Sequence, residues 1–142
     1  MTNMDSQNDQ KAVSNEIDIK NIPTILIVED DPVLAKMYSE KFKFEGFKVI
    51  IAVNGEEGLK LSLSEKIDMI LLDLMLPRLS GTELLAKLRS TPGGKNVKVI
   101  VLTNLAEQEE KDKVTGLGAL EYLIKAMQTP EEVVNKVKEH LG

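Results

Sequence analysis

The chain has 142 residues, of which 42% are hydrophobic and 29% charged, a composition typical of one soluble domain with a single core. The net charge of -5 argues against direct nucleic-acid binding, because phosphate contacts require a basic surface. The absence of cysteine and the single histidine argue against disulfides, thiolate chemistry and multi-histidine metal sites. We interpret that histidine, His140, as a cation in the last turn of the final helix.

We expect no secretory signal at the beginning of the chain. No apolar run approaches the roughly 20 residues needed to span a bilayer, and residues 1–6 lack a basic region and an apolar core. We therefore expect a cytoplasmic location and no membrane partner. Residues 1–21 are mostly polar and predict a flexible N-terminal extension, followed by one domain over residues 22–142.

Short apolar runs then alternate with segments of helical spacing. In chain order we expect a strand over residues 24–28, a helix from Pro32 to the turn at Gly46, a strand over 47–52, a helix over 56–63, a strand over 69–72, a helix over 82–89, a strand over 97–102, a helix anchored between 105 and 117, a strand over 119–124 and a helix over 129–141. Strands that alternate with helices indicate βαβ units, so we predict an α/β fold with a five-stranded parallel sheet and five helices on both faces.

Polar residues before the helices predict their caps. Asp31 stands before Pro32, as an N-cap followed by proline at the first helical position. Ser80 or Thr82 is expected to cap the third helix, and Thr129 the last.

The fourth predicted helix has few apolar anchors. Residues 107–113 are all polar, and only Leu105, Val114 and Leu117 can hold the helix against the sheet. An element with few buried contacts opens at a low free energy, so we expect this helix to be movable.

Candidate functional side chains follow four of the five predicted strands. They are Glu29 and Asp30 after the first strand, Asp73 after the third, Thr103 after the fourth and Lys125 after the fifth. Because the carboxyl ends of parallel strands lie on one edge of a sheet, we expect a single pocket there. Three clustered carboxylates repel one another, and a hard cation such as Mg²⁺ relieves this repulsion. A carboxylate can also attack phosphorus, with Lys125 and Thr103 as donors to the phosphoryl oxygens.

These residues stand in motifs that resemble the receiver domain of two-component response regulators. The motifs occupy residues 28–32, 71–77, 102–104 and 122–125, and the resemblance extends over about residues 22–142. It implies a flavodoxin-like, doubly wound sheet with strand order 2-1-3-4-5. It also implies a signalling module, not a metabolic enzyme, that catalyses its own phosphorylation and slow dephosphorylation.

The resemblance implies a phosphoacceptor and a Mg²⁺ site. Asp73 matches the residue that takes a phosphoryl group from a sensor histidine kinase or a phosphotransfer protein. Glu29 and Asp30 match the acid pair that holds Mg²⁺, with Asp30 as the direct ligand and Glu29 acting mainly through water. The backbone carbonyl of Met75 matches a further metal ligand.

The resemblance also implies a switch. Thr103 and Tyr122 match the switch pair, and Lys125 matches the lysine that binds the phosphoryl group. Phosphorylation would then change the binding of a downstream protein, or of a second copy of the chain. This partner is expected at the fourth helix, the fifth strand and the fifth helix.

Two residues depart from the family's pattern. The family's lysine is usually followed by proline with a cis bond between them, whereas Ala126 follows Lys125 here. A cis bond before a residue other than proline costs about 2.5–4 kcal/mol. The residue after the switch threonine is usually small, but here it is Asn104, whose amide is expected to reach the phosphoryl group or to crowd it.

Two other functions remain open at this point. An aspartate-nucleophile phosphatase of small molecules usually carries a second acid two residues after the nucleophile, where this chain has Met75. A degenerate receiver that only binds partners would lack an acid or the lysine. The chain is either a free-standing regulator or a receiver from a longer protein, and the sequence leaves both open.

Overall fold

The computed structural model describes residues 21–142 and contains one parallel sheet with the strand order β2-β1-β3-β4-β5. The strands are β1 (Thr24–Val28), β2 (Lys48–Ala52), β3 (Met69–Leu72), β4 (Val99–Thr103) and β5 (Glu121–Ile124). The predicted extension over residues 1–21 lies outside the described residues, apart from Asn21.

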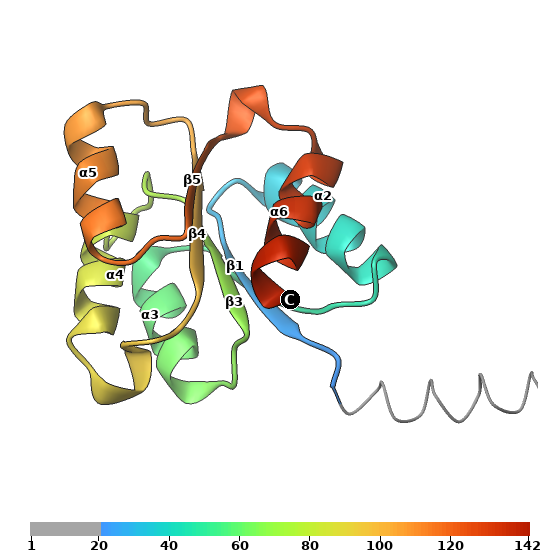
Figure 1. Ribbon diagram of the computed structural model, residues 1–142, viewed down its shortest axis with the longest axis horizontal. Helices are drawn as coiled ribbons and strands as arrows, with labels where there is room; N and C mark the ends of the chain where they lie inside the picture. Colours follow the sequence, from blue (N-terminus) through green and yellow to red (C-terminus); the bar gives the residue numbers. More distant parts are fainter. Residues whose placement is uncertain (1–20) are drawn as a thin grey trace, which may run out of the picture.

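Helices cover both faces of the sheet (Figure 1). They are α2 (Pro32–Phe44), α3 (Gly55–Ser64), α4 (Gly81–Arg89), α5 (Gln108–Gly116) and α6 (Pro130–Leu141), with 3-10 turns η1 (Pro92–Gly94) and η2 (Lys125–Met127). The helices α2 and α6 lie on one face, and α3, α4 and α5 on the other. The predicted doubly wound fold and its strand order are therefore confirmed. Within residues 21–142, no helix is both long and apolar enough to cross a bilayer.

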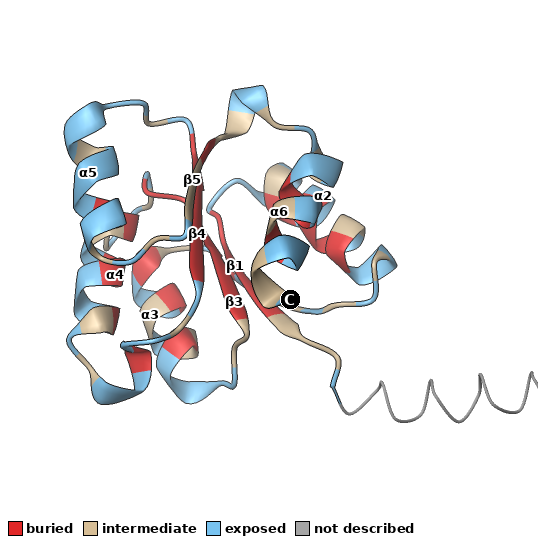
Figure 2. Cartoon of the chain, viewed as in Figure 1, coloured by how far each residue is buried: buried red, intermediate tan, exposed pale blue. Residues whose placement is uncertain are grey.

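The sheet separates two hydrophobic clusters. In β3, Met69 and Leu71 pack on the side of α2 and α6, whereas Ile70 and Leu72 pack on the side of α3, α4 and α5. All four residues are buried, as a strand with helices on both faces requires (Figure 2). Because the central strands are fixed from both sides, their carboxyl ends form a rigid platform for the residues that follow.

Three strands begin later than the sequence predicts. β2 begins at Lys48, β4 at Val99 and β5 at Glu121. Val97 and Ala119 precede the hydrogen-bonded ladder but pack against the core on the side of α3, α4 and α5. The predicted strands are longer than the observed ones because apolar residues just before a strand pack on the core without joining the hydrogen-bonded ladder.

The predicted caps at Asp31 and Thr129 are confirmed, and Ser80 caps the helix α4. Asp31 Oδ1 accepts hydrogen bonds from the backbone N–H groups of Val33 and Leu34, at 2.9 and 3.3 Å. The side chains of Ser80 and Thr129 each accept from the third helical residue, in a capping box. These caps fix where the chain turns back at the carboxyl edge of the sheet.

The start of α4 lies against the end of β3. A Cβ atom at Gly81 would lie 2.2 Å from the carbonyl oxygen of Asp73, so only glycine fits at this position. Gly81 N–H donates to the carbonyl of Leu74 at 3.0 Å. The loop after Asp73 is thereby held close to the sheet.

The helix α5 is held by few contacts. Val114 is its only buried residue, and it has no exposed surface. The Thr82 hydroxyl donates to the Glu110 carboxylate and connects α5 to α4. Beyond the other end of the helix, Arg89 Nε donates to the carbonyl of Leu117 at 2.7 Å. The low burial predicted for this helix is observed, and its mobility stays a prediction.

Candidate functional site

Three carboxylates meet at the carboxyl edge of the sheet. Glu29 and Asp30 follow β1, Asp73 follows β3, and one oxygen atom from each lies within 4.8 Å of the other two. Glu29 and Asp73 are buried, with 4% and 5% of their surface exposed, whereas Asp30 is open to solvent. The order β2-β1-β3 makes β1 and β3 neighbours, so the convergence follows from the topology.

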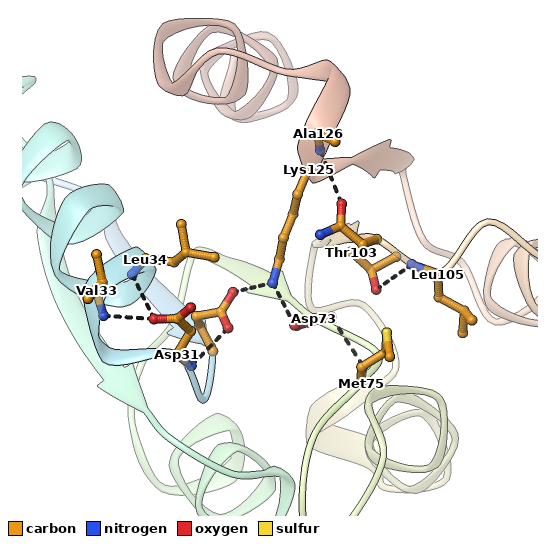
Figure 3. Close-up of polar contacts among 11 residues, drawn as sticks. Asp31, Val33, Leu34, Asp73, Met75, Thr103, Leu105, Lys125 and Ala126 are labelled. Carbon is orange, nitrogen blue, oxygen red and sulfur yellow. Dashed lines mark hydrogen bonds and ion pairs between the residues drawn. The ribbon is translucent and has the colours of Figure 1, made fainter.

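Lys125 lies between two of these acids (Figure 3). Its Nζ atom is 2.5 Å from Glu29 Oε1 and 2.7 Å from Asp73 Oδ2, and its side chain is 10% exposed. Burial favours the neutral amine, but hydrogen bonds to Asp73 and Glu29 outweigh it and raise the pKa of Lys125. Lys125 therefore stays cationic in the pocket at neutral pH.

Glu29 is fixed from two sides. Its Oε2 accepts from the backbone N–H of Asp31 at 3.0 Å, while Oε1 faces Lys125. Burial raises the pKa of Glu29, and the hydrogen bonds from Lys125 and Asp31 oppose this rise without cancelling it. A buried carboxylate with a raised pKa gains from any further cation that comes near it.

The second oxygen of Asp73 has a backbone partner. Met75 N–H donates to Asp73 Oδ1 at 3.1 Å, so the two carboxylate oxygens face different groups. The Met75 side chain points away from the core, and 59% of the residue is exposed. The role of its carbonyl as a metal ligand stays a prediction.

The two residues predicted to act as a switch both contact Leu105, in the loop between β4 and α5. The buried Thr103 is the last residue of β4, and its Oγ1 accepts from Leu105 N–H at 3.2 Å. The Tyr122 hydroxyl, from β5, donates to the Leu105 carbonyl. Within residues 21–142, neither hydroxyl is hydrogen-bonded to the carboxylates, so the structure connects Thr103 and Tyr122 through the loop at Leu105 and not through the pocket.

Comparison with known proteins identifies the family. The model of the response regulator receiver domain matches residues 25–138. The chain belongs to this family.

Its relatives include full-length regulators and isolated receiver domains. The phosphate regulon transcriptional regulatory protein PhoB of Rhizobium meliloti is 35% identical over 111 residues, which cover 78% of this chain and 48% of PhoB. A CheY-like receiver domain from Methanospirillum hungatei superposes with a TM-score of 0.79 at 33% identity, covering 84% of this chain and 94% of that one. The chain spans about half the length of the curated relatives it matches.

A third relative bears on the metal. The receiver domain of sensor histidine kinase PA1611 from Pseudomonas aeruginosa superposes with a TM-score of 0.77 at 26% identity, covering 85% of this chain and 98% of that one. That structure is described with a magnesium ion coordinated in its active site cleft. In the present chain, the carboxylates of Glu29, Asp30 and Asp73 fit the same ion, because Mg²⁺ binds one or two carboxylates and keeps several waters. The exposed Asp30 offers the open side that such waters need.

The two departures from the receiver pattern contact each other. Asn104 Oδ1 accepts a hydrogen bond from the backbone N–H of Ala126 at 3.1 Å. The Lys125–Ala126 bond is trans, like every other peptide bond in residues 21–142. The sequence predicts that the Asn104 amide reaches or crowds the phosphoryl group, and it does not predict the hydrogen bond to Ala126. Only the pairing of β4 with β5 would have indicated it, because that pairing brings the two segments together.

Proposed function

We propose that this receiver domain takes a phosphoryl group onto Asp73 from a sensor histidine kinase or a phosphotransfer protein, in a Mg²⁺-dependent reaction. One observation carries the proposal: Asp73 lies among the acid cluster and also contacts the Lys125 ammonium, at 2.7 Å. A nucleophilic carboxylate, a site for a hard cation and a fixed positive charge are the groups that phosphoryl transfer requires.

The reaction balances with groups of the two proteins. A carboxylate oxygen of Asp73 forms a bond to phosphorus as the bond from phosphorus to the donor's histidine nitrogen breaks. The product is an acyl phosphate on Asp73, and the electron pair of the broken bond remains on the imidazole. Lys125 Nζ lies at Asp73 Oδ2 and is placed to donate to a phosphoryl oxygen, which lowers the cost of the negative charge.

The metal would be held by the side chains of Asp30 and Asp73, by Glu29 mainly through water, and by the Met75 carbonyl. When bound, Mg²⁺ would neutralise charge on the acids and on the transferred group. Support comes from the geometry of the three acids and from the magnesium described in the related receiver domain of PA1611.

The partner surface is proposed at α5, β5 and α6, which are the fourth predicted helix, the fifth strand and the fifth helix. The links from Thr103 and Tyr122 to Leu105 support this choice, because they connect the pocket to the start of α5. A downstream protein or a second copy of the chain would bind there. Phosphorylation would shift an existing equilibrium between two arrangements of α5.

Val114 does not contribute to this surface, because it anchors α5 and is completely buried against the sheet. The periodicity that anchors α5 points this side chain inward. The exposed Lys111 and Lys113 remain candidates, whereas Glu121 already contacts His140 Nε2 at 2.8 Å.

The wider assignments are also proposals. Residues 22–142 would form the receiver domain, and the protein would act in the cytoplasm as a signalling module. A direct nucleic-acid partner is not proposed, given the net charge of -5.

Intact mass spectrometry tests the phosphoacceptor. The protein is incubated with Mg²⁺ and acetyl phosphate, and we expect a mass gain of one phosphoryl group that Asp73→Asn and removal of Mg²⁺ by EDTA both abolish. The matched control is Asp68→Asn, at the other end of β3, where the side chain accepts from Thr24 N–H and an amide oxygen can replace it. A gain that persists in Asp73→Asn would rule out Asp73 as the acceptor.

A further inference from the structure

The clearest feature outside the phosphoryl site is the side-chain contact across the ends of β4 and β5. The ladder pairs Thr103 with Ile124, so the next residues, Asn104 and Lys125, leave the sheet side by side. Asn104 Oδ1 then accepts from Ala126 N–H at 3.1 Å (Figure 3). We propose that Asn104 is a positioning residue, which holds the backbone at Lys125 and Ala126 so that the lysine ammonium stays in the phosphoryl pocket. The inference rests on the proposed function, because it concerns the same lysine.

The hydrogen bond meets a need of the local structure. Lys125 begins the 3-10 turn η2, and its N-cap residue, Ile124, has no side chain that can accept a hydrogen bond. The first N–H groups of any helical turn lack partners within the turn. Asn104 therefore caps η2 from the loop that follows β4. The contact depends on Ala126, because proline at that position would have no N–H to donate.

Few other contacts fix this backbone. Ala126 and Met127 are exposed, and Gln128 N–H makes only a local hydrogen bond to the Lys125 carbonyl at 3.3 Å. Lys125 itself bonds to Glu29 and Asp73. Apart from those bonds, and within residues 21–142, Asn104 is the only residue from another part of the fold whose side chain is hydrogen-bonded to this turn.

The backbone anchor matters most when the pocket changes. The Lys125 ammonium lies at the end of a flexible four-carbon chain, and its present partners are Glu29 and Asp73. A phosphoryl group on Asp73 would replace the carboxylate that Lys125 now contacts. The position of the lysine backbone then determines where the ammonium meets the phosphoryl oxygens. An anchor that does not involve Asp73 keeps that position through the reaction.

Two substitutions separate the hydrogen bond from the shape of the side chain. Asn104→Leu keeps the size but removes the acceptor, whereas Asn104→Asp keeps an acceptor oxygen. The matched control is Asn96→Leu, an exposed asparagine at the opposite edge of the sheet. We expect amide hydrogen exchange at Ala126 to become about twofold to tenfold faster in Asn104→Leu and to stay near the wild-type value in Asn104→Asp and Asn96→Leu.

Two further measurements report on Lys125. In Asn104→Leu, the NMR signals of the Lys125 Cε methylene should shift and show greater motion, and the rate of phosphorylation by acetyl phosphate should fall about twofold to tenfold. Asn96→Leu should change neither. A merely structural role would lower thermal stability without moving the Lys125 signals.

Three results would overturn the positioning role of Asn104. Unchanged exchange at Ala126 in Asn104→Leu would show that the hydrogen bond does not hold this turn. Faster exchange with unchanged Lys125 signals would show that it does not position the lysine. An unchanged phosphorylation rate, with moved Lys125 signals, would also overturn the proposal. If the wild-type protein takes no phosphoryl group, the proposed function fails, and the amide exchange at Ala126 and the NMR signals of Lys125 still test whether Asn104 positions the lysine.

Discussion

At the scale of single residues, the pocket is a balance of buried charges. Within residues 21–142, Lys125 is the one cation that forms ion pairs with the acid cluster, and its partners are Glu29 and Asp73 but not Asp30. The cluster therefore keeps a net negative charge with one side open to solvent. This combination favours a mobile cation at Asp30 and a fixed cation beneath it.

Glu29 gives this balance a measurable pH dependence. Burial raises its pKa above the ordinary value of 4.5, so the folded protein holds this proton more tightly than the unfolded chain. The contribution to stability is complete below pH 4.5 and is lost as the pH rises through the folded pKa. Without metal, we expect the wild type to lose stability over that range relative to Glu29→Gln, whose amide does not titrate.

Urea unfolding at stepped pH in EDTA measures this difference. The control is Glu139→Gln, an exposed glutamate on α6 whose removal should leave the shape of the pH curve unchanged. Parallel curves for the wild type and Glu29→Gln would mean that burial of Glu29 has no effect on its protonation.

At the scale of elements, the loop from Asp73 to α4 contains one unfavourable backbone conformation. Arg78 has φ of 72°, and Leu79 N–H donates to the Pro77 carbonyl at 2.8 Å around it. This is a γ-turn with positive φ at its centre, which is rare and strained for a residue with a Cβ atom. The exposed ion pair of Arg78 with Glu56, at 3.5 Å, offsets little of this cost.

A pair of substitutions at Arg78 isolates the strain. We expect Arg78→Gly to be more stable than Arg78→Ala by about 1 kcal/mol, because only glycine adopts positive φ without a penalty. At Lys87, an exposed position in α4, the order should reverse, with alanine more stable by about 0.5–1 kcal/mol. Chemical denaturation of the four variants measures both differences. Alanine more stable than glycine at position 78 would contradict the strain.

Sequence reasoning recovered the elements that depend on local pattern. Alternating strands and helices predicted a parallel sheet, and a parallel sheet brings Asp73 and Lys125 to one edge although 52 residues separate them. The contacts that sequence reasoning missed depend on how far individual side chains extend from one element to another. Arg89 is the example, since its guanidinium donates to carbonyls at Gly94, Val97 and Leu117. No periodicity reveals such partners before the helices are placed.

In the candidate site too, the positions that follow from strand ends were predicted, whereas a contact between side chain and backbone was not. The positions of Glu29, Asp73 and Lys125 follow from strand ends alone, and the structure brings them together as expected. For Asn104, the sequence predicts an amide that reaches or crowds the phosphoryl group, but it does not reveal the contact with Ala126, because no sequence motif marks a backbone N–H as a partner.

At the scale of the whole molecule, the pocket and the helix α5 are connected through one loop. Thr103 and Tyr122 both contact Leu105, and α5 itself buries only Val114. Arg89 holds the chain at Leu117, just after the helix. We therefore expect a response to phosphorylation to move the beginning of α5 more than its end.

Amide hydrogen exchange with and without the phosphoryl analogue beryllofluoride, in Mg²⁺, tests this expectation. The largest changes in exchange should fall between residues 103 and 125, because α5 has the fewest buried contacts to resist them. Asp73→Asn serves as the control and should show no response. A response confined to α3 and α4 would refute the coupling and redirect the search for the partner surface.

The order of the elements along the chain also determines when the site is complete during synthesis. The ribosome makes Glu29, Asp30 and Asp73 long before Lys125, which follows the last strand. A nascent chain that has not reached Lys125 already contains Asp73 but has no ammonium that could donate to a phosphoryl oxygen. We therefore expect competence for the proposed signal to appear only when the final edge of the sheet has been added.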